Sequence, residues 1–139
     1  MKEEKTPDTI DSDNLRLAME TGTLPPSGEL ERYFLPQTAR QMLPLAQQLE
    51  HAIRRMQHPS RSVIRHLDPF AAKWFEKRER NAIHTDIADI RYRIQVRAHS
   101  LLQIKYRIVL PYPHKQPGYL EDVRQRQGAR QWERVSYKM

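Results

Sequence analysis

Residues 89–110 constrain the fold of this chain most, because apolar and polar side chains alternate along almost the whole stretch. The apolar residues of its two runs are Ile90, Tyr92, Ile94, Val96 and Ala98, followed by Leu102, Ile104, Tyr106 and Ile108. A period of two residues, with β-branched and aromatic side chains on one face, is typical of a half-buried strand. The stretch therefore predicts a β-hairpin.

The alternation also predicts the length of the hairpin loop. A three-residue loop at 99–101 places Ala98 opposite Leu102 and keeps both apolar runs on one face, whereas a two-residue loop would mix the faces. The loop contains no glycine, although tight hairpins favour that residue. A helix is the alternative, but it leaves Tyr92, Val96 and Tyr106 on its polar side. The apolar residues that match a helix are Ile87, Ile90, Ile94, Ala98, Leu101 and Ile108.

Two helices are predicted before the hairpin. Residues 38–58 carry apolar side chains at helical spacing, with Thr38 as the N-cap and Pro44 as a point where the first turns kink. A second helix is predicted to begin at Asp68, a capping residue followed by Pro69, whose fixed φ suits the first helical position. Its apolar patch, expected in the core, consists of Phe70, Ala71, Trp74 and Phe75. A base-stacking role for Trp74 is the alternative to that core position.

The predicted fold is α+β and mainly helical, with two main helices packed on a basic β-hairpin and with extended N- and C-terminal segments. An all-α fold is the alternative. We divide the chain into an acidic flexible leader (1–32), a compact basic core (33–110) and a Pro-interrupted basic tail (111–139). The leader has a weak helix at 14–20 that would need to dock, with Gly22 just past its end. The tail has a short helix at 120–135.

Charge is distributed unevenly along the 139 residues, whose formal net charge is +7. Residues 1–32 hold four basic and eight acidic side chains, and residues 33–139 hold 20 basic and nine acidic ones. Cysteine is absent, which excludes disulfides and thiolate metal sites. No apolar run approaches the ~20 residues of a membrane-spanning helix. The N-terminus has no signal-peptide pattern, so we expect an intracellular protein with no membrane association.

The basic side chains predict the function. On the hairpin, five cations share one face without an intervening acid, and directly opposed cations such as Arg93 and Arg107 would repel one another without an anionic partner. The predicted nucleic-acid contacts are Arg91, Arg93, Arg97, Lys105 and Arg107, joined by Arg124, Arg126 and Arg130 of the tail. Trp132 would add base stacking. We therefore expect an accessory subunit of a nucleoprotein complex that binds RNA or DNA mainly through phosphates.

The rival hypothesis is a protein–protein adaptor or assembly subunit whose extended termini wrap a partner. We find no nucleophile elbow, phosphate-binding glycine loop or metal-binding motif in the sequence. We therefore expect no catalysis, no cofactor and no metal. The sequence leaves the oligomeric state open.

Overall fold

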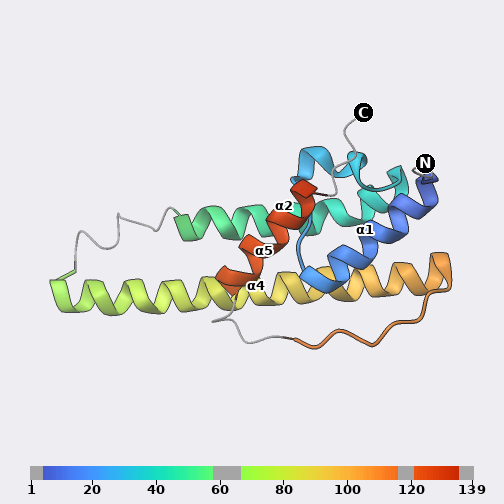
Figure 1. The fold of residues 1–139 in the computed structure, drawn as a ribbon. Helices are drawn as coiled ribbons and strands as arrows, with labels where there is room; N and C mark the ends of the chain where they lie inside the picture. The colour runs from blue at the N-terminus through green and yellow to red at the C-terminus, as the bar shows by residue number, and fades with distance from the viewer. Residues whose placement is uncertain (1–4, 58–66, 116–120, 135–139) are drawn as a thin grey trace.

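Every regular element of the described residues is a helix in this computed structural model, which describes residues 5–57, 67–115 and 121–134 and, in the last range, the side chains of 126–133. The elements are α1 (Pro7–Thr21), the short 3-10 helix η1 (Ser27–Arg32), α2 (Pro36–Gln57), α4 (Pro69–Tyr106) and α5 (Glu121–Arg134). The long helix α4 runs the length of the molecule. It lies beside α2, which runs in the opposite direction, and α1 packs across its C-terminal half (Figure 1).

The predicted β-hairpin is wrong: residues 89–106 continue α4, and the all-α alternative fits the structure. The buried residues of this helix recur every three or four positions. The apolar residues on this repeat are Ile83, Ile87, Ile90, Ile94, Ala98 and Leu102, and the adjacent Ala88 and Arg91 are buried as well.

The period of two had a different origin. Helix α4 is covered on several sides, so its apolar residues do not form a single stripe. Tyr92 lies against Tyr112 of the extended segment 107–115, and Tyr106 contacts Asp11 of α1. A helix with one apolar face and one polar face would leave Tyr92 and Tyr106 on the polar face. In the structure both tyrosines contact neighbouring segments.

The predicted leader does not form a separate part of the fold. Residues 7–21 are helical, and Leu15 and Ala18 of α1 lie in the same core as Ile94 and Leu102 of α4. Residue 32 is therefore not a boundary between a leader and a core. The weak helix that needed a docking surface has one on α4.

The ends of the helices agree only in part with the predicted signals. Asp68 caps α4 as predicted, since its Oδ1 accepts from the Ala71 amide at 2.8 Å. Gly22 follows α1 as predicted, with the left-handed φ of 66° that favours glycine. Thr6, however, caps α1. Thr38 lies inside α2 and donates its hydroxyl hydrogen to Asp11, so its predicted role as an N-cap is wrong.

The core lies between α1, α2 and the C-terminal half of α4, and α5 closes one side of it. Trp132 of α5 is buried against the rings of Tyr33 and Phe34 and donates Nε1–H to Thr23 Oγ1 at 2.9 Å. Helix α4 is longer than α2 and extends beyond the C-terminal end of α2 (Figure 1). We call this N-terminal part of α4, residues 69–82, the α4 arm.

Candidate nucleic-acid interface

The helix separates the five cations that the hairpin would have placed on one face. Arg93 and Arg97 are one turn apart, exposed, and on the same side of α4. They form no ion pair with any described residue. Arg91 and Lys105 are directed toward α1, and Arg107 ends the helix. Only Arg93 and Arg97 of the predicted set therefore form a shared, free surface on α4.

Arg91 is a structural residue. It is 5% exposed, and its Nη2 donates to the carbonyl of Thr21 in the last turn of α1. The neighbouring Gln95 donates Nε2–H to the carbonyl of Met19 at 2.9 Å. The last carbonyls of a helix have no partner within the helix, so these two side chains satisfy acceptors that would otherwise be unpaired. The guanidinium also favours the negative end of the α1 dipole.

Lys105 belongs to a network around the buried carboxylate of Asp11. Its Nζ lies 3.4 Å from Asp11 Oδ2, which also accepts from the Tyr106 hydroxyl at 2.5 Å and from the Thr38 hydroxyl at 3.1 Å. Asp11 Oδ1 accepts from the Leu35 amide at 2.9 Å. Burial, and then the hydrogen bond to Asp11, raise the pKa of Tyr106. The network joins α1, the start of α2 and the end of α4, so Lys105 has an internal role.

The remaining predicted contacts lie away from this network. Arg107 is the C-cap of α4 with a left-handed φ of 58°, and its side chain is exposed. Arg126 and Arg130 are exposed on α5. Arg124 lies in α5, but its side chain is outside the described residues. The predicted base-stacking role of Trp132 is wrong, because its ring is buried against Tyr33 and Phe34.

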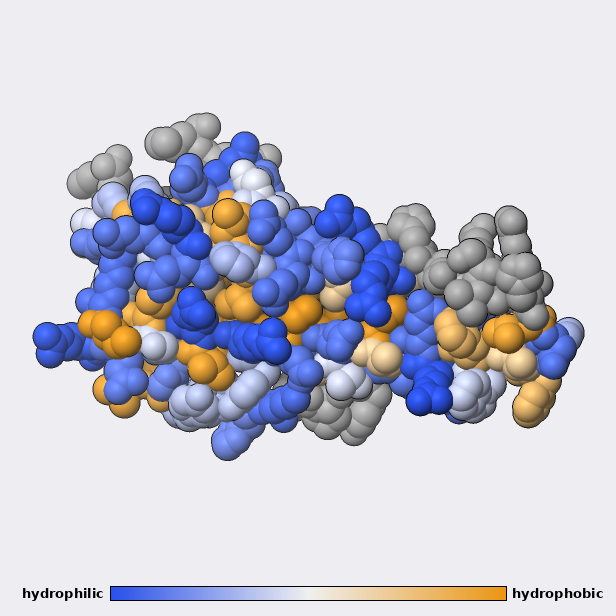
Figure 2. Space-filling model, turned by 180° about the vertical axis from the view of Figure 1, so that it is seen from behind, coloured by the Kyte–Doolittle hydropathy of each residue, from blue (hydrophilic) through white to orange (hydrophobic). Residues whose placement is uncertain are grey.

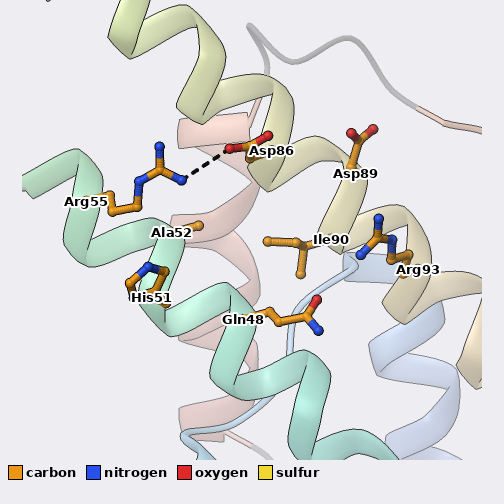
Figure 3. A pocket seen from close by; sticks show the side chains of 8 residues that line it. All are labelled: Gln48, His51, Ala52, Arg55, Asp86, Asp89, Ile90 and Arg93. Atoms are coloured by element: carbon orange, nitrogen blue, oxygen red, sulfur yellow. Dashed lines mark hydrogen bonds and ion pairs between the residues drawn. The ribbon is translucent and has the colours of Figure 1, made fainter.

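A polar groove lies between α2 and α4, and Arg93 is one of the residues that line it. The cavity has a volume of about 230 Å³, and Figure 3 shows Arg55 and His51 entering from α2 and Arg93 from α4. It is lined by Gln48, His51, Ala52, Arg55, Asp86, Asp89, Ile90 and Arg93. Both carboxylates of the groove are paired, Asp86 with Arg55 at 3.3 Å and Asp89 with Lys115. Arg93 is left as the groove's uncompensated cation among the described residues.

Cations and acids of α4 differ in exposure. Seven of its cations are exposed, namely Lys73, Lys77, Arg78, Arg80, Arg93, Arg97 and Lys105. All four of its acids are partly buried, namely Glu76, Glu79, Asp86 and Asp89. Exposed cations outnumber these acids, of which the Asp86 and Asp89 side chains keep 49% and 37% of their surface accessible, so the helix presents net positive potential to an approaching partner. This separation is along the direction from the helix axis to solvent, and sequence order alone does not reveal it.

The α4 arm carries a feature that sequence reasoning assigned wrongly. Phe70 is 84% exposed and Trp74 is 56% exposed, so the predicted core position of these rings is wrong. Apolar surface gathers at this end of the molecule, on the right in Figure 2. A signal was present in the sequence. Trp74 precedes Ile83 by nine residues, which is about half a turn around an α-helix from the buried face.

The comparisons with known proteins give no relative for this chain. No protein-family model matches it, and no curated protein or solved structure shows significant similarity to it. In the part of the chain that the structure describes, no group of three or more His, Asp and Glu side chains is placed to hold a metal ion. None of the described helices combines the length and apolarity needed to cross a membrane.

Proposed function

We propose that this chain is a non-catalytic, intracellular nucleic-acid-binding subunit that contacts phosphates through the exposed cations of α4. The observation that carries the proposal is the exposure of seven cations on α4, against four acids that are all less exposed as whole residues. The chain as a whole carries a net charge of +7. Arg93 and Arg97 support the proposal further, since neither has an ion-pair partner among the described residues.

Phosphate suits these side chains physically. A guanidinium donates from a planar fork that matches two phosphate oxygens, and Arg93 and Arg97 rise along the helix by about 6 Å relative to one another. Because both are exposed and neither has an ion-pair partner among the described residues, binding phosphate breaks no ion pair within that part of the chain. Release of condensed counterions then supplies most of the affinity, without dependence on base sequence.

The test uses two double variants that remove the same charge. Arg93→Gln/Arg97→Gln removes the two exposed cations of α4, and Arg16→Gln/Arg32→Gln removes two exposed cations of the acidic N-terminal part. Binding of a mixed-sequence oligonucleotide is measured by fluorescence anisotropy over a salt series. In the first variant the slope of log K against log salt, which is negative, should decrease in magnitude by about 0.7–0.9 for each lost phosphate contact. In the second variant the slope should change little.

Equal slopes for the parent and the Arg93→Gln/Arg97→Gln protein would remove these arginines from the interface. Absence of salt-dependent binding to any nucleic acid would reject the proposed function as a whole. Circular dichroism of both variants checks that the helices are intact, because neither pair touches the core.

A protein adaptor is the second candidate, and a specific observation favours it. At the C-terminal end of α4, Ile104 is 74% exposed and Val109 is 80% exposed. Large exposed apolar side chains at one end of a molecule are typical of protein contacts. If this candidate is correct, a partner should co-purify after nuclease treatment and in high salt, and Ile104→Ser/Val109→Ser should release it.

A further inference from the structure

The exposed rings of the α4 arm form a row with a cation. Phe70, Trp74 and Arg78 follow one another at intervals of four residues, which places them on one side of the helix about one turn apart. The guanidinium carbon of Arg78 lies 5.1 Å from the centroid of the Trp74 ring. Trp74 nevertheless keeps more than half of its surface exposed, so a second planar group has access to it. We call these three residues the arm patch.

The exposed charges along the arm patch itself are cations, and the exposed acid Asp68 lies at the helix N-cap before it. Lys73, Lys77 and Arg80 are exposed on the same arm, and no residue of the arm is buried. The two acids of the arm, Glu76 and Glu79, are partly buried. A neutral, apolar groove on a partner protein would not require cations beside the exposed rings. Their presence favours an anionic partner. The patch therefore offers π-faces for planar groups and cations for the charges that accompany them.

We propose that the arm patch binds single-stranded nucleic acid by stacking bases on Trp74 and Phe70 while the neighbouring cations contact the phosphates. This inference rests on the proposed function and specifies its substrate class. Every base has a π-face, so stacking tolerates any sequence, and an arginine beside the ring adds a cation–π contribution. In a duplex the faces of the bases are already stacked on one another, so rings on a helix surface reach them only after the strand is opened.

The experiment separates stacking from charge by changing the ligand. Short deoxythymidine oligonucleotides are compared with abasic oligonucleotides of the same length, which carry the same phosphates without bases. The parent should bind the deoxythymidine strand about 5- to 100-fold more tightly than the abasic strand, the range that one stacked base supplies. Trp74→Leu should abolish most of that ratio, and Trp74→Phe, which keeps a π-face, should retain it.

Tryptophan fluorescence gives a direct readout at the site. Trp132 is 3% exposed, so a quencher or a stacked base should act on Trp74 alone. Titration with the deoxythymidine strand should quench the parent, whereas the abasic strand should not. Ile104→Ser is the matched control, because Ile104 is an exposed apolar residue at the other end of the same helix. It should leave both the ratio and the quenching unchanged.

Three results would overturn this inference, and each differs from failure of the proposed function. The first is equal, salt-dependent binding of the deoxythymidine and abasic strands. The second is a Trp74→Leu protein that keeps the parent's ratio. The third is Trp74 quenching by anionic phospholipid vesicles but not by the deoxythymidine strand. Lack of binding to both strands would instead reject the proposed function itself.

Discussion

The α4 arm and the rest of α4, residues 83–106, belong to one continuous helix but differ in what surrounds their side chains. Beyond Ile83 an apolar residue is buried on almost every turn, whereas no residue of the arm is buried. Both parts are rich in cations, yet Arg91 and Lys105 contact α1 while the cations of the arm face solvent. The comparison shows that a helix can continue without burial of its side chains. Helical hydrogen bonding extends over 38 residues, whereas buried side chains occur only from Ile83 onward.

Helix α1, which packs on this part of α4, carries two of the buried polar groups of the fold. Asp11 and Asn14 of α1 lie with their side chains buried, and each has hydrogen-bond partners that fix α1 against its neighbours. A buried polar group is stabilising only when it is paired, and loss of its partner leaves an unsatisfied group in a low-dielectric environment. Substitutions of the buried, paired residues in this part should therefore affect stability, and substitutions of exposed residues such as those of the arm should affect binding.

Asp11→Ala should have the largest effect on stability. The carboxylate accepts from Leu35, Thr38 and Tyr106, and its removal leaves one buried and two partly buried donors without this acceptor. We expect a loss of about 3 kcal/mol in the free energy of unfolding, measured by urea denaturation. Asp13→Ala is the control, since its exposed pair with Lys5 is typical of those that contribute under about 1 kcal/mol. Equal losses for the two variants would contradict the network.

Arg91→Met should cost less, about 2 kcal/mol, because it removes the donor to the Thr21 carbonyl but keeps an apolar stem in the core. Arg93→Met, two residues along the same helix and exposed, should change stability by less than about 0.5 kcal/mol. In the nucleic-acid binding assay we expect the opposite order. Arg93→Met should weaken binding more than Arg91→Met does, when Arg91→Met is assayed under conditions in which it is folded. A destabilised Arg93→Met with a stable Arg91→Met would contradict the assignment of Arg91 to the buried face of α4 and of Arg93 to its exposed face.

These two arginines also show how far sequence could predict the fold. The cap at Asp68 and the helix over most of 36–57 followed from local signals, whereas residues 1–32 were predicted to be a flexible leader and the docking of α1 on α4 was not. The hairpin did not, because residues 89–110 satisfy both periods and the choice depends on contacts with α1 and with 107–115. Arg91 and Arg93 are equivalent in a strand and are separated by about 200° around a helix. Their different environments were therefore decided by tertiary contacts.

Gly128→Ala should destabilise the fold by about 1 kcal/mol, because a methyl group at this position of α5 would lie 2.5 Å from Thr23 Cγ2 and Oγ1. The same Thr23 hydroxyl accepts a hydrogen bond from Trp132 Nε1. Displacing Thr23 would therefore weaken the hydrogen bond that helps to hold the indole ring in the core. The higher helix propensity of alanine offsets part of the cost. Gly28→Ala is the control, since its added methyl group meets nothing within 4 Å. The two variants should differ in thermal midpoint, and identical midpoints would contradict close packing of α5.

The pH dependence of stability tests the Tyr106 end of the network. Because the folded state raises the pKa of Tyr106, the unfolded chain releases this proton first as pH rises past about 10. The contribution is therefore complete below that pH and declines above it, until Tyr106 also ionises in the folded state. Tyr106→Phe should show a shallower decline in the free energy of unfolding between pH 10 and pH 11 than the parent does. Parallel curves for the two proteins would contradict the coupling between Tyr106 and Asp11.

Trp74→Leu should have the smallest effect on stability, and this sharpens the comparison most. The ring is more than half exposed on an arm without buried residues, and leucine has a helix propensity at least as high as tryptophan. We expect a change of less than about 0.5 kcal/mol in urea unfolding. Loss of the contact between the Trp74 ring and Arg78 is included in that figure, because exposed cation–π pairs contribute little. A loss of several kcal/mol would mean that the arm is packed in solution, and its rings would then belong to the core rather than to a binding surface.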